Sequence, residues 1–249
     1  IDCAKAIGAR VARPKKSVRE LQGMLRVLRP IPTIFAVPTT AGTGSETTIA
    51  AVITEDETHH KASINDISLL PRYAVLDPEL TVGLPPRTTA TTGLDALCHA
   101  VEAYTNHLYN SELENEMCRK AVKLIYDNLY KAYQDGSNIT ARQNMQQAAF
   151  YAGRAFTRGC VGYVHAIGHT LGGIYLVPHG LAMAILLPHV LRAYGSAVHD
   201  RLAELSDVCG MTEMTASKAE KANAFIRWIE YMKDAMDIPE YPTMIQKAD

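Results

Sequence analysis

The sequence predicts a mixed α/β front part, residues 1–83, followed by an all-helical domain, residues 84–249. Before the paired prolines at 85–86, short apolar runs end in proline, glycine and polar clusters, which is the pattern of strands. After them, apolar residues recur at helical spacing through the rest of the chain. The helical part also holds aspartate and histidine residues in pairs four positions apart, a spacing that stacks two side chains on one helix face. We therefore expect the helical domain to carry the chemistry.

Composition limits the classes of partner. At 249 residues with 47% apolar content, the chain is long enough for one large domain or two modest ones. Its 25 basic and 26 acidic residues leave a net charge of −1, which argues against a nucleic-acid partner. Five cysteines without a CxxC pair favour reduced thiols and a cytoplasmic protein. No apolar run reaches the ~20 residues of a membrane span, so we expect no membrane partner.

The front part begins with a patchily helical stretch over residues 4–28, which basic residues interrupt. Residues 31–37 form a short apolar run that ends at a proline, and we expect a buried strand there. The loop at residues 38–46 (PTTAGTGSE) has no large apolar side chain. Such a loop either approaches an anionic ligand with its backbone N–H groups or is an ordinary polar loop.

Three more strands are expected before the prolines. Residues 47–54 and 61–64 should pair around a polar turn at residues 55–58. Residues 73–76 should form a further short strand, which Asp77 and Pro78 close. The front part is therefore expected to be rich in strands, with one helical stretch ahead of them.

The back part reads as a series of helices. Residues 88–105 combine an apolar stripe with a polar stripe, which predicts an amphipathic helix. Further helices are expected at residues 161–174, 181–194 and 197–208, and around residues 225–236. Three capping boxes are predicted ahead of apolar-periodic segments, at Ser111 with Glu114, Thr140 with Gln143, and Ser217 with Glu220.

Five residues of the helical domain predict a metal site. Asp95 and His99 are four apart, as are His165 and His169, and His179 follows in a turn. Three imidazoles and one carboxylate suit Fe(II) or Zn(II), with Mn(II) as a third candidate, and leave a position open for substrate. The spacing alone does not choose among the histidines.

The other histidines read as ordinary residues. His189 lies in an apolar run and is expected to be a core or cap histidine. The remaining four are expected on the solvated surface, at His59, His60, His107 and His199.

At these residues the sequence resembles the iron-containing (group III) alcohol dehydrogenases, the family that includes lactaldehyde and propanediol oxidoreductases. The resemblance rests on residues 38–46 (PTTAGTGSE), 93–102 (GLDALCHAVE) and 162–169 (GYVHAIGH), and continues through the Pro-His-Gly at 178–180. It implies an incomplete Rossmann-like N-terminal part, 1–83, that remains from a dinucleotide-binding domain. An all-α metal-binding catalytic domain, 84–249, would follow in a dehydroquinate synthase-like architecture.

The resemblance also implies roles for individual residues. The metal ligands would be Asp95, His99, His165 and His179, while His169 would lie near the nicotinamide and substrate and act in catalysis. The cofactors would be Fe(II), with Zn(II) as the alternative, and NAD or NADP, and the protein would be a homodimer. Positions that match the family's dinucleotide contacts are Asp2, Thr39, Thr40, Thr43, Lys61 and Thr81.

The chain starts without Met, inside what reads as a helix, and lacks the glycine-rich turn that the family carries just ahead of this point. We therefore expect a piece of a longer protein that lacks the N-terminal part of the cofactor domain and the extreme C-terminus. As such a piece, it could also be a catalytically incomplete metal-binding module.

The predicted function is a metal-dependent alcohol dehydrogenase, or aldehyde reductase, that moves hydride between NAD(P) and a small primary alcohol, diol or aldehyde. An alternative within the superfamily is a zinc-dependent polyol or polyol-phosphate dehydrogenase. An alternative of another class is a helical metal-dependent phosphohydrolase, for which His199 and Asp200 would supply a His-Asp dipeptide.

Overall fold

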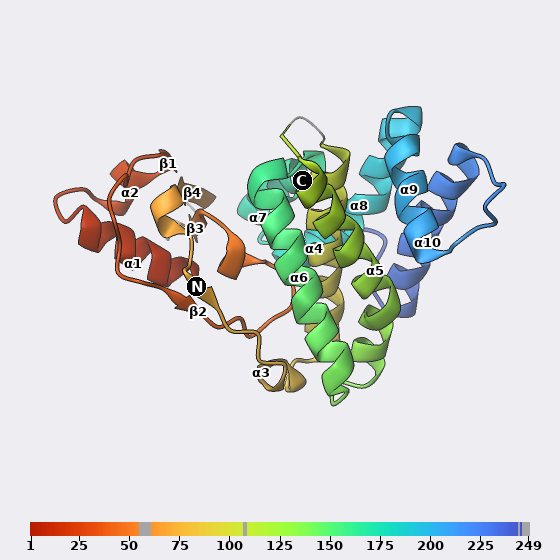
Figure 1. The fold of residues 1–249 in the computed structure, drawn as a ribbon, viewed down its shortest axis with the longest axis horizontal. Coiled ribbons are helices and arrows are strands. Elements are labelled where there is room, and N and C mark those ends of the chain that lie inside the picture. The colour runs from red at the N-terminus through yellow and green to blue at the C-terminus, as the bar shows by residue number, and fades with distance from the viewer. Residues whose placement is uncertain (55–60, 107–108, 244, 246–249) are drawn as a thin grey trace.

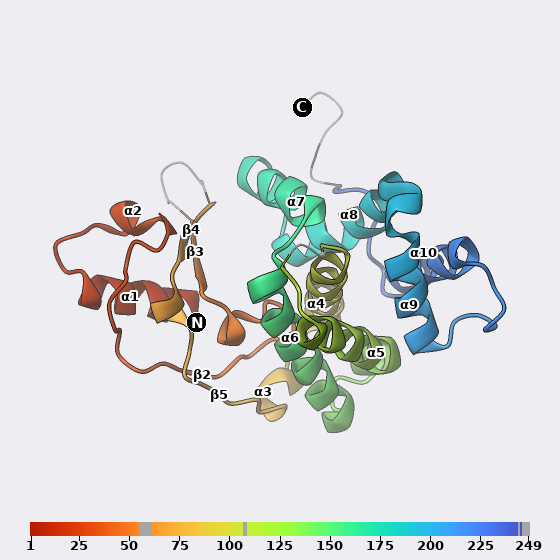
Figure 2. The same ribbon diagram turned by 45° about the horizontal axis from the view of Figure 1, so that its top comes forward.

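The computed structural model describes residues 1–54, 61–106, 109–243 and 245. The strands lie in the front part, at the red and orange end of the chain, and a larger assembly of helices lies beside it (Figure 1). Each part has its own apolar cluster. The helical part holds the larger one, and Figure 2 shows α4 inside it, between α5, α6 and α8.

The front part packs a helix against a small sheet. Helix α1 (Asp2–Ala12) lies next to the sheet of β1 (Gly23–Met24), β4 (Lys61–Asn65) and β3 (Ala50–Thr54), in the order β1-β4-β3. Strands β3 and β4 pair antiparallel, which confirms the pairing predicted for them, and the turn at 55–58 lies outside the described residues. The front cluster is made of Ala6, Ala9, Leu21, Val27, Ala51, Ile64 and Leu69.

The interrupted helical stretch expected over residues 4–28 is confirmed as far as residue 21 and is wrong beyond it. Helix α1 ends at Ala12, two residues before Pro14, because proline disfavours the helical conformation of the residue ahead of it. Ser17 then begins a second short helix, α2 (Val18–Leu21), with a capping box to Glu20. Beyond α2, the stretch contains only the two-residue strand β1 and irregular backbone.

The buried strand expected at residues 31–37 is also wrong. Only β2 (Phe35–Ala36) is a strand, and it pairs in parallel with β5 (Tyr73–Ala74) in a separate two-stranded sheet. Phe35 is 64% exposed and stacks on Tyr73, with their ring centroids 4.6 Å apart. An apolar run predicts a strand but does not say whether a second layer covers it. Among the described residues, Phe35 belongs to neither apolar cluster.

Helix α4 (Pro86–Thr105) is the centre of the helical part. It packs against α5 (Glu112–Gln134), α6 (Ile139–Gly159) and α8 (His179–Tyr194). Every residue from Gly93 to Tyr104 is buried, so the helix is covered on all sides. Its polar stripe therefore points into the protein, not into solvent as in an ordinary amphipathic helix.

The other helices close around this centre. They are α3 (Glu79–Val82), α7 (Tyr163–Ile174), α9 (His199–Cys209) and α10 (Lys218–Ala235). The capping boxes predicted at Ser111 and Ser217 are confirmed. The box predicted at Thr140 is wrong, because α6 begins earlier: Asn138 is its N-cap and accepts a 3.0 Å hydrogen bond from the N–H of Ala141.

One helical stretch is more apolar than the sequence analysis expected. Residues from His179 to Cys209 are long and apolar enough to cross a membrane by length and composition alone. However, 56% of the most apolar window is buried, and α8 packs against α4, α7 and α10, as the core helix of a soluble protein does. His189 of α8 is exposed, so the core position expected for it is wrong.

The loop at residues 38–48 joins the two parts by entering the helical part. Gly44 has φ +59° and lies backbone to backbone against Gly153 of α6, where a Cβ would meet the Gly153 Cα at 2.7 Å. Gln146 of the same helix donates from Nε2 to the carbonyls of Pro38 (3.2 Å) and Asp77 (3.0 Å), which lie on two segments that run between the parts. The front part is thus attached to α6 through one backbone-to-backbone contact and through hydrogen bonds from the Gln146 side chain to two backbone carbonyls.

We predict that Gly153→Ala lowers the free energy of unfolding by about 1–3 kcal/mol, the usual cost of overpacking. An added Cβ would stand 2.9 Å from both the Cα and the carbonyl oxygen of Gly44, and backbone moves less readily than a side chain. Urea denaturation followed by circular dichroism measures the change. Gly83→Ala is the control, since its Cβ would meet nothing within 4 Å and should change stability by less than about 0.5 kcal/mol. Equal stability of the two variants would contradict the close backbone contact between Gly44 and Gly153.

Candidate metal centre

Four side chains from three helices converge inside the helical part. Asp95 and His99 lie one turn apart on α4, His165 lies in the first turn of α7, and His179 is the first residue of α8. One donor atom from each lies within 4.8 Å of the others. Asp95 Oδ1 is 3.4 Å from His179 Nε2 and 3.8 Å from His165 Nε2. Around a tetrahedral metal with bonds of about 2.1 Å, ligand atoms stand about 3.4 Å apart, so these spacings fit a metal.

The cluster is incomplete without a further partner. Asp95 Oδ1, His99 Nδ1 and His165 Nε2 are buried and have no hydrogen-bond partner among the described residues. The side chains of Asp95 and His165 are only 2% and 3% exposed. Burying unpaired polar atoms is costly, so native structures leave few of them. A divalent cation bound between these residues accounts for Asp95 Oδ1 and His165 Nε2, which face each other across the cluster.

The protonation states also suit a cation. Burial alone would raise the pKa of Asp95, but the neighbouring imidazoles of His99, His179 and His165 hold it well below its usual value. Burial lowers the pKa of His99 to about 3, although the Asp95 carboxylate opposes that shift. At neutral pH the cluster therefore offers a carboxylate and a neutral imidazole, the forms that bind metals.

A neighbouring trio does not form a second metal site. Cys98, Glu102 and His165 also place one donor atom each within 4.8 Å. However, His165 Nδ1 and Glu102 Oε2 are only 2.5 Å apart, which is the distance of a hydrogen bond and too short for two ligands of one ion. Burial also raises the pKa of the Cys98 thiol well above its usual value, so the sulfur keeps its proton. Glu102 and Cys98 instead contact Nδ1 of His165, the ring nitrogen that does not face Asp95.

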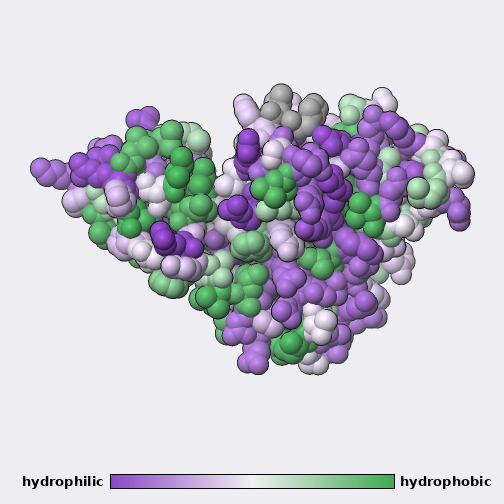
Figure 3. Space-filling view, viewed as in Figure 1, coloured by the Kyte–Doolittle hydropathy of each residue, from purple (hydrophilic) through white to green (hydrophobic). Residues whose placement is uncertain are grey.

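The cluster opens into a cavity of about 490 Å³ between the two parts of the chain. His99, His165, His169 and His179 line its helical side. In the surface view, a notch separates the front part from the helices on the upper side (Figure 3). The front wall comes from the start of α1, the loop at residues 43–50 and the sheet. It includes Asp2, Thr43, Ser45, Thr48, Lys61 and Ser63.

Comparison with known proteins places this fold in a family. Residues 89–242 match the family model of the C-terminal part of the Fe-containing alcohol dehydrogenases, and residues 1–78 match the iron-containing alcohol dehydrogenase model. The chain belongs to the iron-containing alcohol dehydrogenase family. The resemblance drawn from the sequence is thereby confirmed, and so is the expected architecture of an incomplete α/β part followed by a helical domain.

Curated relatives and solved structures agree with this placement. The chain is 40% identical to a 1,3-propanediol dehydrogenase of Klebsiella pneumoniae over 96% of its length and 62% of the relative's. It is 38% identical to an NAD-dependent methanol dehydrogenase of Bacillus methanolicus over the same shares. The crystal structure of a 1,3-propanediol oxidoreductase superposes with a TM-score of 0.92 at 38% identity, covering 96% of this chain and 62% of that one. The chain therefore spans less than two thirds of the length of these relatives.

His169 lies beside the four-residue cluster but is not one of its donors. Its ring centroid is 5.1 Å from that of His179 and 5.7 Å from that of His165, and it lines the cavity. Burial, followed by the two imidazoles and Lys61, lowers its pKa to about 4. The structure thus separates His169 from the donor set, a distinction that the spacing alone left open.

Of the six predicted dinucleotide contacts, three line the cavity: Asp2, Thr43 and Lys61. Lys61 reaches across from β4, so that a Cβ added to Gly172 of α7 would stand 3.2 Å from its Nζ. Thr39 and Thr40 lie in the loop outside the cavity lining, and Thr81 is buried in α3, where its hydroxyl donates to the Pro78 carbonyl. The structure therefore places half of these residues on the cavity into which the four-residue cluster opens.

The sequence analysis missed Lys5, which shapes the front wall. Its side chain is fully buried, and its Nζ donates to the carbonyls of Ser45 (2.6 Å), Thr48 (2.8 Å) and Ala50 (2.9 Å). Burial lowers the pKa of Lys5 to about 8, while Asp2 and Glu46 act against that shift. A single lysine in a helix gives no pattern that predicts burial, so only the structure reveals this contact.

The end of α6 supplies a second group of residues that the sequence did not indicate. Phe156, Thr157, Cys160 and Val161 line the cavity, and the Phe156 ring stacks on His99 with centroids 4.2 Å apart. Cys160 has φ +62°, a left-handed backbone that non-glycine residues adopt rarely. The side chains of Phe156 and Val161 thus give the cavity an apolar wall on this side, with Phe156 in contact with the four-residue cluster.

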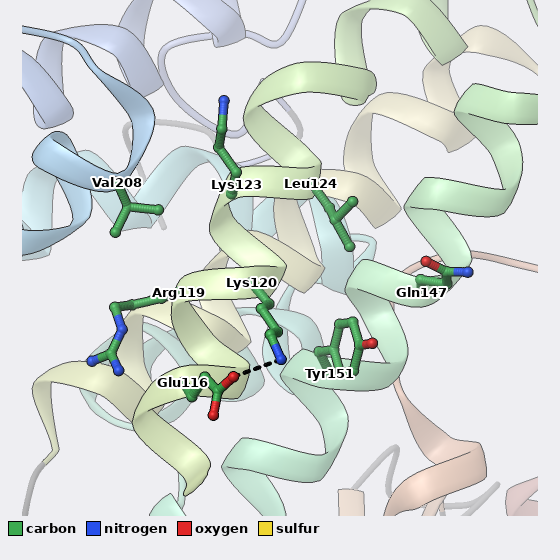
Figure 4. Close-up of a pocket in the computed structure, with 8 residues that line it drawn as sticks. All are labelled: Glu116, Arg119, Lys120, Lys123, Leu124, Gln147, Tyr151 and Val208. Carbon is green, nitrogen blue, oxygen red and sulfur yellow. Dashed lines mark ion pairs between the residues drawn. The ribbon is translucent and has the colours of Figure 1, made fainter. Parts of the chain in front are cut away.

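A second hollow, and the histidines outside the cavity that the structure describes, carry no comparable site. A surface hollow along α5 contains Arg119, Lys120 and Lys123 (Figure 4). Each of these cations is paired with a carboxylate on α5, respectively Glu112, Glu116 and Asp127. His199 is half-buried at the start of α9, and the exposed Asp200 pairs with Lys218 at 2.9 Å. His59, His60 and His107 lie outside the described residues.

We predict that Lys5→Met lowers the free energy of unfolding by about 1–3 kcal/mol, the penalty for leaving buried acceptors unpaired. Three backbone carbonyls would lose their donor inside the protein. Denaturant unfolding measures the effect. Lys218→Met removes an exposed ion pair instead and should change stability by less than about 1 kcal/mol. A Lys5→Met variant as stable as that control would show that the contacts of Lys5 contribute little.

Proposed function

We propose that the protein is a metal-dependent, NAD(P)-dependent alcohol dehydrogenase, or aldehyde reductase, that acts on a small primary alcohol, diol or aldehyde. The observation that carries this proposal is the set of unpaired donors of Asp95, His99 and His165 at a cavity that the cofactor side also lines. Relatives named as dehydrogenases of 1,3-propanediol, methanol and 1-propanol support the substrate class.

We infer that Asp95, His99, His165 and His179 hold the metal, and that Fe(II) is the natural ion with Zn(II) as the alternative. The donor set supports this assignment because it combines three imidazoles with a carboxylate and has no thiolate. When bound, the metal would supply a Lewis acid for the substrate oxygen, and the nicotinamide would supply or accept the hydride. The solved structures that superpose include a sulfoacetaldehyde reductase of Bifidobacterium kashiwanohense in complex with NAD⁺, at 30% identity.

The chain's own residues would bind the substrate, shield it and move its proton. Phe156 and Val161 line the cavity next to the cluster and would keep water from the reacting carbon. His169 is the imidazole that lines the cavity outside the donor set, and it would relay the proton of the substrate hydroxyl. Lys61 would place its positive charge near the cofactor phosphates or ribose, between β4 and α7.

The alternatives fit the site less well. A polyol-phosphate dehydrogenase requires a basic phosphate pocket, whereas Lys61 is the one lysine or arginine that lines the cavity in the part of the chain that the structure describes. A phosphohydrolase at His199 and Asp200 would need converging carboxylates, and Asp200 instead pairs with Lys218 on the surface. A homodimer in the cytoplasm remains our prediction for the whole protein.

We predict that His165→Ala and His179→Ala empty the metal site, whereas His169→Ala keeps it filled and lowers turnover by about 10²–10⁴-fold. The first two variants remove donors, and the third removes a proton relay. Metal per chain, measured by elemental analysis after anaerobic reconstitution, separates the two effects. Equal metal loss in all three variants would contradict this division of roles.

The activity itself is tested by anaerobic reconstitution with Fe(II) or Zn(II), followed by oxidation of NADH or NADPH in the presence of lactaldehyde or propanal. We expect about one metal per chain and aldehyde-dependent oxidation of one of the two cofactors. Metal binding without turnover by the complete protein would refute the dehydrogenase proposal. Failure to bind metal would refute the donor assignment.

A further inference from the structure

Glu102 is a buried carboxylate that the proposed mechanism does not use. It lies seven residues after Asp95 on α4, and its side chain is 2% exposed. Its two oxygens have different partners. Oε1 accepts a 2.7 Å hydrogen bond from the backbone N–H of Val164, and Oε2 lies 2.5 Å from Nδ1 of His165.

Both contacts lie at the start of α7, which carries His165. The first backbone N–H groups of a helix have no partner within it, and the N-terminus of a helix favours a negative charge. Glu102 places its negative charge at this helix N-terminus and accepts the Val164 N–H. Gly162 allows the backbone to approach the carboxylate, because a Cβ there would stand 2.9 Å from Glu102 Oε1. Glu102 therefore fixes where α7 begins relative to α4.

The same carboxylate limits which nitrogen of His165 can bear a proton. A carboxylate accepts hydrogen bonds and donates none, so the short contact to Oε2 requires the proton on Nδ1. Nε2 is then left with its lone pair, and it is the nitrogen that faces Asp95 Oδ1 at 3.8 Å without a hydrogen-bond partner. A metal-binding histidine needs this free lone pair, and its other nitrogen commonly donates to a carboxylate.

We propose that Glu102 is a positioning residue for the metal centre, which sets the tautomer and the orientation of His165 while it anchors the first turn of α7. One oxygen of Glu102 accepts from the Val164 N–H and the other lies against His165 Nδ1, so a single carboxylate holds the backbone and the imidazole of this turn together. Cys98 does not replace it, since its Sγ atom lies 3.8 Å from His165 Nδ1, whereas Glu102 Oε2 lies at 2.5 Å. The proposal rests on the metal role inferred for His165.

Glu102→Gln tests the proposal with almost no change in volume. A glutamine has one acceptor oxygen, so it does not satisfy both the Val164 N–H and the His165 Nδ1–H. With its oxygen on Val164, its amide donates to Nδ1 and moves the imidazole proton to Nε2, which blocks the lone pair that a metal needs. We expect metal affinity to fall about 10–100-fold, the usual effect of losing such a partner.

The primary readout needs neither metal nor turnover. Nitrogen NMR of ¹⁵N-histidine-labelled, metal-free protein reports which ring nitrogen of His165 carries the proton. We expect Nδ1–H in the wild type and a shift towards Nε2–H in Glu102→Gln. Competition with a chelator then gives the affinity for Zn(II) in both proteins.

Glu114→Gln is the matched control. Glu114 is also a buried helical glutamate that accepts two hydrogen bonds, from the N–H and the hydroxyl of Ser111. It is not one of the residues that contact the four-residue cluster. This variant should lose stability while keeping the His165 tautomer and the Zn(II) affinity of the wild type. Loss of affinity in both variants, or in Glu102→Gln with an unchanged tautomer, would overturn the positioning role.

These outcomes are separate from those of the proposed function. A wild-type protein with Nδ1–H at His165 and no Zn(II) binding would refute the metal assignment but would leave the contact with Glu102 intact. A protein that binds Zn(II) equally well with and without the Glu102 carboxylate would refute the present inference and leave the donor set standing.

Discussion

The structure depends on the burial of Asp95 in the middle of α4. A carboxylate in that position is stabilised by the imidazoles around it, and those imidazoles come from α4, α7 and the start of α8. Three helices must therefore be placed so that their polar atoms meet within 4.8 Å, although each of these atoms would be better solvated in the unfolded chain. Because a bound cation offsets that cost, metal binding and folding of the helical domain should be thermodynamically linked.

The cavity adds a second constraint, since its walls belong to both parts of the chain. The loop at residues 38–48 enters the helical part, where Gly44 lies against Gly153 and Gln146 holds the backbone of Pro38 and Asp77. On the other side, Lys5 ties α1 to the segment that lines the cavity. The position of the front wall relative to the four-residue cluster is thus fixed by one backbone contact and by two buried side chains that donate to backbone carbonyls.

The spacing within one helix could be predicted from the sequence, but contacts between segments could not. Asp95 and His99 share a face of α4 because i and i+4 always do, and the antiparallel pair of β3 and β4 follows from two apolar runs around a turn. In contrast, His165 and His169 also share a face, and only the packing of α7 decides that the first is buried and the second lines the cavity outside the donor set. The exposed Phe35 was missed for the same reason, since no local pattern reports which layer covers a strand.

Asp95 and Glu102 show how their hydrogen bonds distinguish the residue that we propose as a metal ligand from the one that we propose as its support. Both are 2% exposed carboxylates on one stripe of α4, and both lie close to His165, so neither burial nor sequence position distinguishes them. The difference lies in their partners. Both oxygens of Glu102 have hydrogen-bond partners at the start of α7, whereas Asp95 keeps an unpaired Oδ1 that faces two imidazoles. A carboxylate oxygen that already has a hydrogen-bond partner can orient that partner, whereas an unpaired oxygen is available to a cation. The two proposed roles therefore follow from the fact that the Val164 N–H and His165 Nδ1 face Glu102 and not Asp95.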